Sequence, residues 1–130
     1  MVVERLRHIT PALSDDRGWI TNVLELDIRH VSVIFSKKGS VRGNHFHKLD
    51  TQYLYCVSGG FQSRSTDVIT RETGSFLVGP GDLVKTPPKV AHTETFFEDT
   101  ILVAMYTTPR EAIDFSDTFK FPEEAFKALE

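Results

Sequence analysis

Cysteine is almost absent from this sequence, since Cys56 is the only one in 130 residues. No internal disulfide is possible, and the chain suits a reducing compartment. Long apolar runs are also absent, because none approaches the roughly 18 residues that read as a membrane span. Residues 1–20 are rich in charge, so we see no signal peptide. We therefore expect a cytoplasmic protein that does not bind membranes.

An excess of positive charge is missing as well. The net charge is -3 at pH 7, whereas proteins that bind nucleic acids usually carry basic patches. We expect no nucleic-acid partner, although a small anionic ligand needs only two or three local cations. Apolar residues make up 40% and charged residues 25%, as in ordinary globular proteins. The length predicts one domain over residues 1–130 with a single core.

Short runs of Val, Ile, Phe, Thr and Tyr alternate with Gly, Pro, Asp and Ser. Strands separated by hairpin-length turns predict an all-β sandwich or barrel. A short amphipathic helix is predicted over residues 122–130, which begin with Pro and two acids. The predicted strands cover residues 19–26, 30–36, 41–47, 52–59, 60–67, 75–81, 82–88, 91–98 and 100–107.

Three of the five histidines fall in predicted strands where they can share a site. His45 and His47 are two residues apart, so on a strand both side chains point to the same face. His92 lies in another predicted strand, after a turn that contains Pro. A lone histidine in a strand is more often structural, and we interpret His8 and His30 that way. Three convergent imidazoles are costly as core filling, because each needs a hydrogen-bond partner.

The spacing of these histidines resembles the two motifs of the cupin family. Gly39, His45, His47, Gln52 and Gly59 follow the first motif. The second motif is matched by Gly81, Pro87 and His92. The resemblance implies a cupin double-stranded β-helix, that is, a jelly-roll barrel.

The cupin resemblance also implies a metal site, which the family builds from three His and a Glu. Here Gln52 stands where the family has that Glu, so the fourth ligand is neutral and weaker. The candidate metal ligands are His45, His47, Gln52 and His92, and the metal would be Zn, Fe, Mn or Ni. Further departures from the motif are Lys89 in place of Gly and Phe96 in place of Asn.

Two further stretches narrow the choice among cupins. "DDRG" (15–18) and "VRGNH" (41–45) resemble segments of dTDP-4-dehydrorhamnose 3,5-epimerases, in which the His at position 45 is the base. The closer resemblance is to dTDP-4-keto-6-deoxyhexose 3,4-ketoisomerases, which read like "RG-x-H-x-HK" followed by Gln, Cys and Gly. It implies an isomerase that moves a proton next to a ketone and requires no metal. Gln52 fits this pattern.

The resemblance assigns roles to individual residues. His45 and His47 are the candidate catalytic bases, and Tyr106 is a candidate catalytic tyrosine because the strand at 30–36 has Ser32 and Val33 where ketoisomerases carry one. Tyr53 and Tyr55 have the opposite parity to Gln52 and should face away from the site. Arg17 and Arg42 are candidates for the diphosphate, since guanidinium binds phosphate bidentately. The remaining candidates for substrate binding are Trp19, Asn44, Gln52 and His92.

Three hypotheses therefore remain open from the sequence. The first is a nucleotide-sugar isomerase or epimerase. The second is a metal-dependent, dioxygenase-like cupin. The third is a cupin that binds a sugar nucleotide without catalysis. In the resembling families the opening strand often crosses to a second subunit, and the apolar stretch 19–26 is suited to that, so we expect a homodimer.

Overall fold

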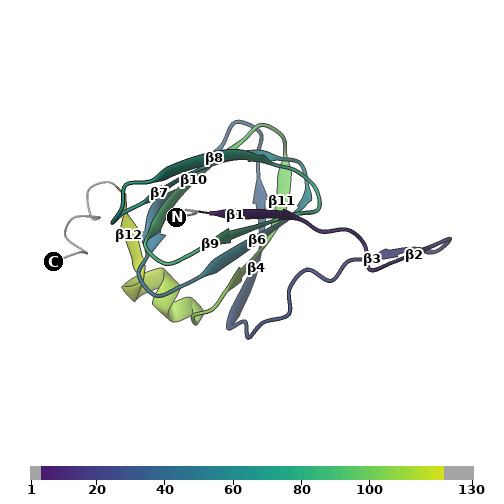
Figure 1. The fold of residues 1–130 in the computed structure, drawn as a ribbon, viewed down its shortest axis with the longest axis horizontal. Helices are drawn as coiled ribbons and strands as arrows, with labels where there is room; N and C mark the ends of the chain where they lie inside the picture. Colours follow the sequence, from purple (N-terminus) through teal and green to yellow (C-terminus); the bar gives the residue numbers. More distant parts are fainter. Residues whose placement is uncertain (1–3, 122–130) are drawn as a thin grey trace.

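Two antiparallel sheets face each other and curve around a common interior (Figure 1). The computed structural model describes residues 4–121, apart from the side chains of residues 114 and 115. One sheet has the strand order β1-β9-β6-β11-β4, and the other has the order β12-β5-β10-β7-β8. Most neighbouring strands are distant in sequence, as in a jelly roll. The predicted all-β barrel is confirmed.

The strands match most of the predicted ranges closely. Within the described residues no helix is long and apolar enough to span a membrane. In chain order the elements are β1 (Arg5–His8), β2 (Leu13–Asp15), β3 (Gly18–Ile20), β4 (His30–Ser36), β5 (Val41–His47), β6 (Gln52–Ser58), β7 (Phe61–Asp67), β8 (Thr73–Val78), β9 (Asp82–Thr86), β10 (Val90–Phe96), β11 (Thr100–Tyr106), the π-helical turn η1 (Ala112–Ser116) and β12 (Thr118–Lys120).

An apolar core occupies part of the space between the two sheets. Inward-facing residues of β6, β7, β9, β10 and β11 alternate with outward-facing ones, as the period of a strand requires. Four core residues, Leu54, Phe96, Leu102 and Tyr106, also line the cavity described below. The core therefore forms part of the wall of the cavity.

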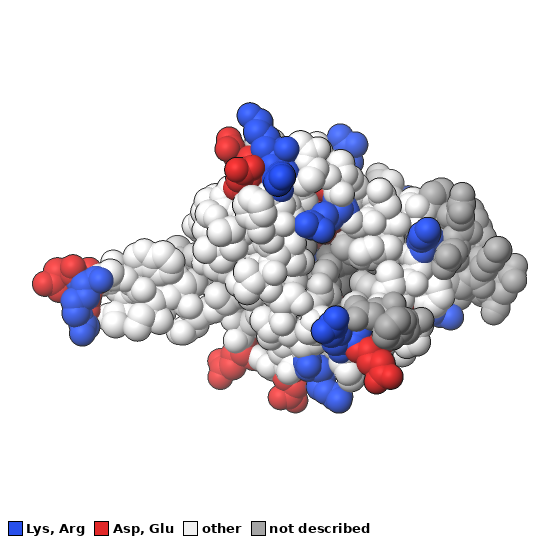
Figure 2. Space-filling view, turned by 180° about the vertical axis from the view of Figure 1, so that it is seen from behind, with Lys and Arg blue, Asp and Glu red and all other residues white. Residues whose placement is uncertain are grey.

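A hairpin made of β2 and β3 extends away from the barrel and pairs with no other strand of residues 4–121 (Figure 1). We call residues 13–20 the arm. Uncharged atoms run along the projection in Figure 2, and charged side chains gather at its far end. Trp19 and Ile20 are 65% and 56% exposed. The arm is not packed on its own barrel, so its apolar side chains are exposed to solvent.

The predicted strand over residues 19–26 is wrong beyond residue 20. β3 ends at Ile20 because its only partner is the three-residue strand β2. Residues 21–25 follow as chain without strand pairing, and Val23, Leu24 and Ile28 pack instead against the outside of the first sheet. The predicted helix over residues 122–130 lies outside the described residues.

Asp117 ties the end of the barrel to the loop between β5 and β6. Its buried carboxylate accepts hydrogen bonds from the backbone N–H groups of Lys48, Leu49 and Asp50, at 3.0 to 3.2 Å. β12 follows directly and pairs with β5. A buried carboxylate that accepts several N–H groups stabilises a loop, since each of those donors would otherwise be unsatisfied.

We predict that Asp117→Ala lowers the free energy of unfolding by about 3 kcal/mol, because three backbone donors lose a charged acceptor. The measurement is urea denaturation of the variant and the unmodified protein. Asp16→Ala, at the exposed end of the arm, is the matched control and should change stability by less than about 0.5 kcal/mol. Equal effects of the two substitutions would contradict the role of Asp117.

Candidate active site

The barrel encloses one open cavity of about 510 Å³. Polar side chains gather on one part of its wall, and apolar side chains from the core form the rest. The polar part contains the three histidines of the sequence motifs together with Gln52 and Tyr106. The complete lining is Ile34, Val41, Arg42, Gly43, His45, His47, Gln52, Leu54, His92, Glu94, Phe96, Leu102, Tyr106, Ile113 and Thr118.

β5 places His45 and His47 on the cavity side, as its period of two predicts. Phe46 lies between them in the sequence and points the other way. There it is fully buried in a second cluster with Val68 and Ala91, and its ring stacks on Phe119 of β12. The apolar residue between the two histidines therefore anchors the strand that carries them.

Gly43 allows β5 and β10 to approach each other closely enough to bring His45 opposite His92. Its φ is 96°, and a Cβ there would lie 2.5 Å from the carbonyl oxygen of His92 and 2.7 Å from a carboxylate oxygen of Glu94. The register of β5 against β10 shifts beside it, between His92 and Thr93. A side chain at position 43 would push the two strands apart.

Each of the three imidazoles is held by a different backbone or side-chain acceptor. The ring of His45 bonds to the backbone of Gly43. Nδ1 of His47 donates to the carbonyl oxygen of Asp117 at 2.8 Å. Nδ1 of His92 donates to Oε1 of Glu94 at 2.6 Å. The rings of His45 and His47 lie 5.1 Å apart, and those of His45 and His92 lie 4.7 Å apart.

The surroundings separate the pKa values of these histidines. Burial lowers the pKa of His45 to about 3, and the neighbouring His92 and His47 add to the effect. Burial also lowers the pKa of His47. At His92 burial acts in the same direction, but the charge and hydrogen bond of Glu94, aided by Glu4, outweigh it and raise the pKa. The ring of His45 is therefore neutral throughout the neutral pH range.

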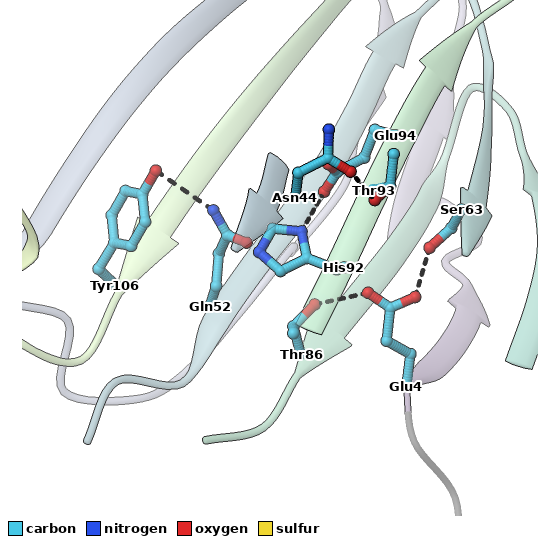
Figure 3. Close-up of polar contacts among 9 residues, drawn as sticks. All are labelled: Glu4, Asn44, Gln52, Ser63, Thr86, His92, Thr93, Glu94 and Tyr106. Carbon is cyan, nitrogen blue, oxygen red and sulfur yellow. Dashed lines mark hydrogen bonds and ion pairs between the residues drawn. The ribbon is translucent and has the colours of Figure 1, made fainter. Parts of the chain in front are cut away.

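Gln52 and Tyr106 meet across the neighbouring strands β6 and β11. Nε2 of Gln52 donates to the hydroxyl oxygen of Tyr106 at 3.3 Å (Figure 3). Tyr106 also stacks on His30, with ring centroids 4.7 Å apart. The tyrosine that we inferred from the last long strand therefore lines the cavity. Tyr53 and Tyr55 pack on the outer face, as their parity predicts.

The structure brings Arg42 to the cavity but leaves three other predicted residues outside it. Arg42 is fixed by hydrogen bonds from Nε to Oγ of Ser36 and from a terminal nitrogen to the carbonyl oxygen of Phe35. Arg17 and Trp19 lie on the arm, where Arg17 pairs with Asp15 at 2.7 Å. The side chain of Asn44 accepts a hydrogen bond from the Thr93 hydroxyl and does not line the cavity.

The sequence motifs did not single out Glu94, although a signal for it exists. Glu94 is two residues after His92, so the two side chains share the inner face of β10. An acid with the parity of a candidate catalytic histidine could have been proposed on that basis. Thr118 and Asp117 could not, because nothing local predicts that β12 pairs with β5 beside the histidines.

The residues present fit a small divalent metal. One ring nitrogen from each of His45, His47 and His92 lies within 4.8 Å of the others. Nε2 of His92 and Oε1 of Gln52 are buried and have no hydrogen-bond partner among the described residues. A histidine that donates Nδ1–H to a carboxylate and offers Nε2 is a common metal ligand. The same free atoms equally suit a bound polar substrate.

Solved structures resemble this chain over nearly its whole length, whereas no protein-family model and no curated protein sequence matches it. A variant of the 3,4-ketoisomerase QdtA from Thermoanaerobacterium thermosaccharolyticum, in complex with TDP-4-keto-6-deoxyglucose, is 20% identical with a TM-score of 0.81, covering 98% of this chain and 94% of that one. A 3,4-ketoisomerase from Helicobacter canadensis is 16% identical with a TM-score of 0.82, over 97% and 96%.

An epimerase has the same architecture. The dTDP-4-dehydrorhamnose 3,5-epimerase from Sulfolobus tokodaii is 17% identical with a TM-score of 0.77, and the match covers 96% of this chain and 80% of that one. At these identities the likeness shows a common fold. It confirms the predicted cupin double-stranded β-helix.

We predict that His45 makes stability depend on pH. The unfolded ring titrates near 6.5 and the folded one near 3, so between these values the unfolded state binds more protons and stability falls as the pH falls. Acidification from pH 7.5 to 5 should stabilise His45→Asn relative to the unmodified protein by about 2 kcal/mol. Urea denaturation at several pH values measures this difference, and a difference that does not vary with pH would contradict it.

Proposed function

We propose that the protein is a nucleotide-sugar isomerase or epimerase that acts on a dTDP-linked 4-keto-6-deoxyhexose by proton transfer next to the ketone. The main support is the cluster of three imidazoles that face one cavity, each held from behind. The similar solved structures include a 3,4-ketoisomerase in complex with TDP-4-keto-6-deoxyglucose and a dTDP-4-dehydrorhamnose 3,5-epimerase. Their likeness supports the substrate class, and the cluster supports the chemistry.

The reaction needs a base, a stabiliser of negative charge and a proton donor. A 4-ketone acidifies the proton on C3, and the neutral ring of His45 or His47 can remove it. The enediolate that forms requires a cation or proton donor nearby. Protonation of C4, with loss of the C3 hydroxyl proton, moves the ketone from C4 to C3. Protonation of C3 from the opposite face inverts that carbon instead.

The rest of the cavity suits the rest of the substrate. Leu54, Phe96 and Leu102 offer an apolar wall, which fits the methyl group of a 6-deoxy sugar better than a hydroxymethyl group. Arg42 is part of the lining, has its guanidinium partly exposed and can pair with the diphosphate. Tyr106, beside Gln52, is the candidate proton donor of the polar wall.

We expect the protein to convert dTDP-4-keto-6-deoxyglucose in D2O into a new ketosugar, or to incorporate deuterium next to the ketone. NMR and mass spectrometry of the sugar identify the product and separate isomerisation from epimerisation. His45→Asn should lower the rate at least about a hundredfold, in line with loss of a general base. His47→Asn, measured beside it, assigns the roles of the two rings.

The matched control is His8→Asn, because His8 pairs with Asp82 on the surface and does not line the cavity. That variant should keep its rate within about twofold. No deuterium and no new sugar would reject the proposal for this substrate. Binding of dTDP without turnover would favour a non-catalytic sugar-nucleotide-binding cupin, and a near-normal His45→Asn would reject the assignment of the base.

A metal-dependent enzyme is the second candidate, favoured by the three ring nitrogens within 4.8 Å of one another. His45, His47 and His92 would hold Zn, Fe, Mn or Ni, with Gln52 as a neutral oxygen ligand. When bound, such a metal would polarise a substrate oxygen. Elemental analysis decides between the two candidates. Less than about a tenth of an equivalent after metal-replete growth would reject the metal, whereas near-stoichiometric metal would favour it over the metal-free reaction.

The functional unit of this proposal is a cytoplasmic homodimer. The arm exposes Trp19 and Ile20, and the edge strand β4 exposes Val31, Val33 and Phe35 on its outer face. Exposed apolar edges of this kind favour association. Pairing through them, with the arm laid against the second copy, would cover these side chains and bring Arg17 and Trp19 towards a neighbouring cavity.

We predict that light scattering after gel filtration gives twice the mass of one chain, and that Val33→Asp converts the dimer to monomer by placing a charge in the covered face. Leu77→Asp is the matched control, since Leu77 is similarly exposed but lies on β8 at the edge of the other sheet. It should remain dimeric. A monomeric unmodified protein would contradict the proposed assembly.

A further inference from the structure

His92 differs from the other two histidines of the cavity in what holds it. Carbonyl oxygens of the backbone hold His45 and His47, whereas a carboxylate holds His92. We propose that Glu94 is a positioning residue, which keeps Nδ1 of His92 protonated and directs Nε2 towards the substrate in the cavity. This inference rests on the proposed function and adds a residue that neither sequence motif contains.

The contact between Glu94 and His92 is short and shielded from water. Nδ1 and Oε1 are 2.6 Å apart, and the side chains of His92 and Glu94 are only 2% and 5% exposed. The hydrogen bond fixes the ring because an imidazole has only two nitrogens, and the partner of one determines what the other can do. Glu94 therefore sets both the orientation of the ring and the nitrogen that carries the proton.

The second ring nitrogen of His92, Nε2, indicates where a ligand would bind. Nε2 of His92 is buried and has no hydrogen-bond partner among the described residues, and the same holds for Oε1 of the nearby Gln52. Figure 3 shows His92 between Gln52 and Glu94. Buried polar atoms in native proteins nearly always have a partner. Two such atoms on the wall of one cavity are the places where a polar substrate would supply it.

The carboxylate of Glu4 is also buried in the barrel, and it has other partners. Glu4 accepts hydrogen bonds from the hydroxyl groups of Ser63 and Thr86 and makes none to His92 (Figure 3). Glu94 lies against Gly43, whose missing side chain leaves room for the carboxylate. The room beside β5 and the bond to His92 together explain why an acid occupies position 94.

This arrangement gives His92 a chemical role that differs from that of its neighbours. A carboxylate behind an imidazole stabilises positive charge on the ring, which a carbonyl oxygen does less well. With Nδ1 protonated, Nε2 accepts the proton of a substrate hydroxyl group, and the imidazolium that forms donates Nε2–H to the oxygen on which the enediolate develops negative charge. His45 and His47 are then left to exchange protons with carbon, and the three rings are not interchangeable.

The test is Glu94→Leu, which keeps the volume of the side chain but removes the acceptor. Nitrogen-15 NMR of the histidine rings, assigned by the signals lost in His92→Gln, reports which nitrogen carries a proton in the free protein. We expect Nδ1 of His92 to be protonated in the unmodified protein and unprotonated in Glu94→Leu. The kcat for the ketosugar should fall about 10- to 100-fold, with KM within about threefold.

Two further variants make the result specific. Glu94→Gln keeps an oxygen acceptor. If NMR shows that Nδ1 of His92 is protonated in this variant, its kcat should stay near that of the unmodified protein. If Nδ1 is unprotonated, its kcat should fall as in Glu94→Leu. Glu4→Gln, at a buried carboxylate that makes no hydrogen bond to His92, should leave Nδ1 of His92 protonated. Nδ1 that stays protonated in Glu94→Leu, or a kcat that stays within twofold after Nδ1 loses its proton, would overturn the inference.

The two arms of the experiment separate this inference from the proposed function. NMR is performed on the free protein and needs no substrate, so it tests the hold of Glu94 on His92 directly. If the unmodified protein converts no ketosugar, the proposed function fails while NMR still decides the role of Glu94. If turnover occurs and NMR shows no effect of Glu94→Leu, the function stands and the inference fails.

Discussion

Three imidazoles can lie side by side in a barrel only if each ring has a partner for the nitrogen that faces away from the cavity. Burial without such a partner costs several kilocalories per mole for each polar group. Much of the local structure meets this requirement. The backbone of Gly43 serves His45, the carbonyl group of Asp117 serves His47 and the carboxylate of Glu94 serves His92. The shifted register of β5 against β10 also brings His45 opposite His92.

The sequence predicts those parts of the molecule that depend on local alternation. β4, β5 and β11 lie at or within one residue of their predicted bounds, since each run of β-branched and aromatic residues is bordered by turn residues. Strand parity also placed His45 and His47 on one face, and it turned Tyr53 and Tyr55 outwards. Parity applied to β10 would have added Glu94 to the site.

Long-range pairing could not be predicted in the same way. β12 is three residues long and has no distinctive alternation, yet it pairs with β5 and places Asp117 beside His47. Trp19 and Ile20 of the arm were expected to begin a strand that runs to residue 26, because an apolar sequence does not show where its partner strand ends. The positions of Arg17 and Trp19 outside the cavity follow from such pairings, and local sequence carries no information on them. The outward position of Asn44, in contrast, follows from its parity, because it is adjacent to His45 on β5.

The docking of β12 has a consequence for the order of folding. Asp117 is 70 residues from His47, and its carboxylate closes the loop after β5 from 67 to 69 residues away. Contacts between residues so far apart in the sequence form late in folding. The chain must lose the entropy of closing the loop before these contacts can stabilise the structure. During synthesis the two histidines of β5 leave the ribosome long before their anchor. The cavity would therefore acquire its final geometry only after the chain has been made past residue 117.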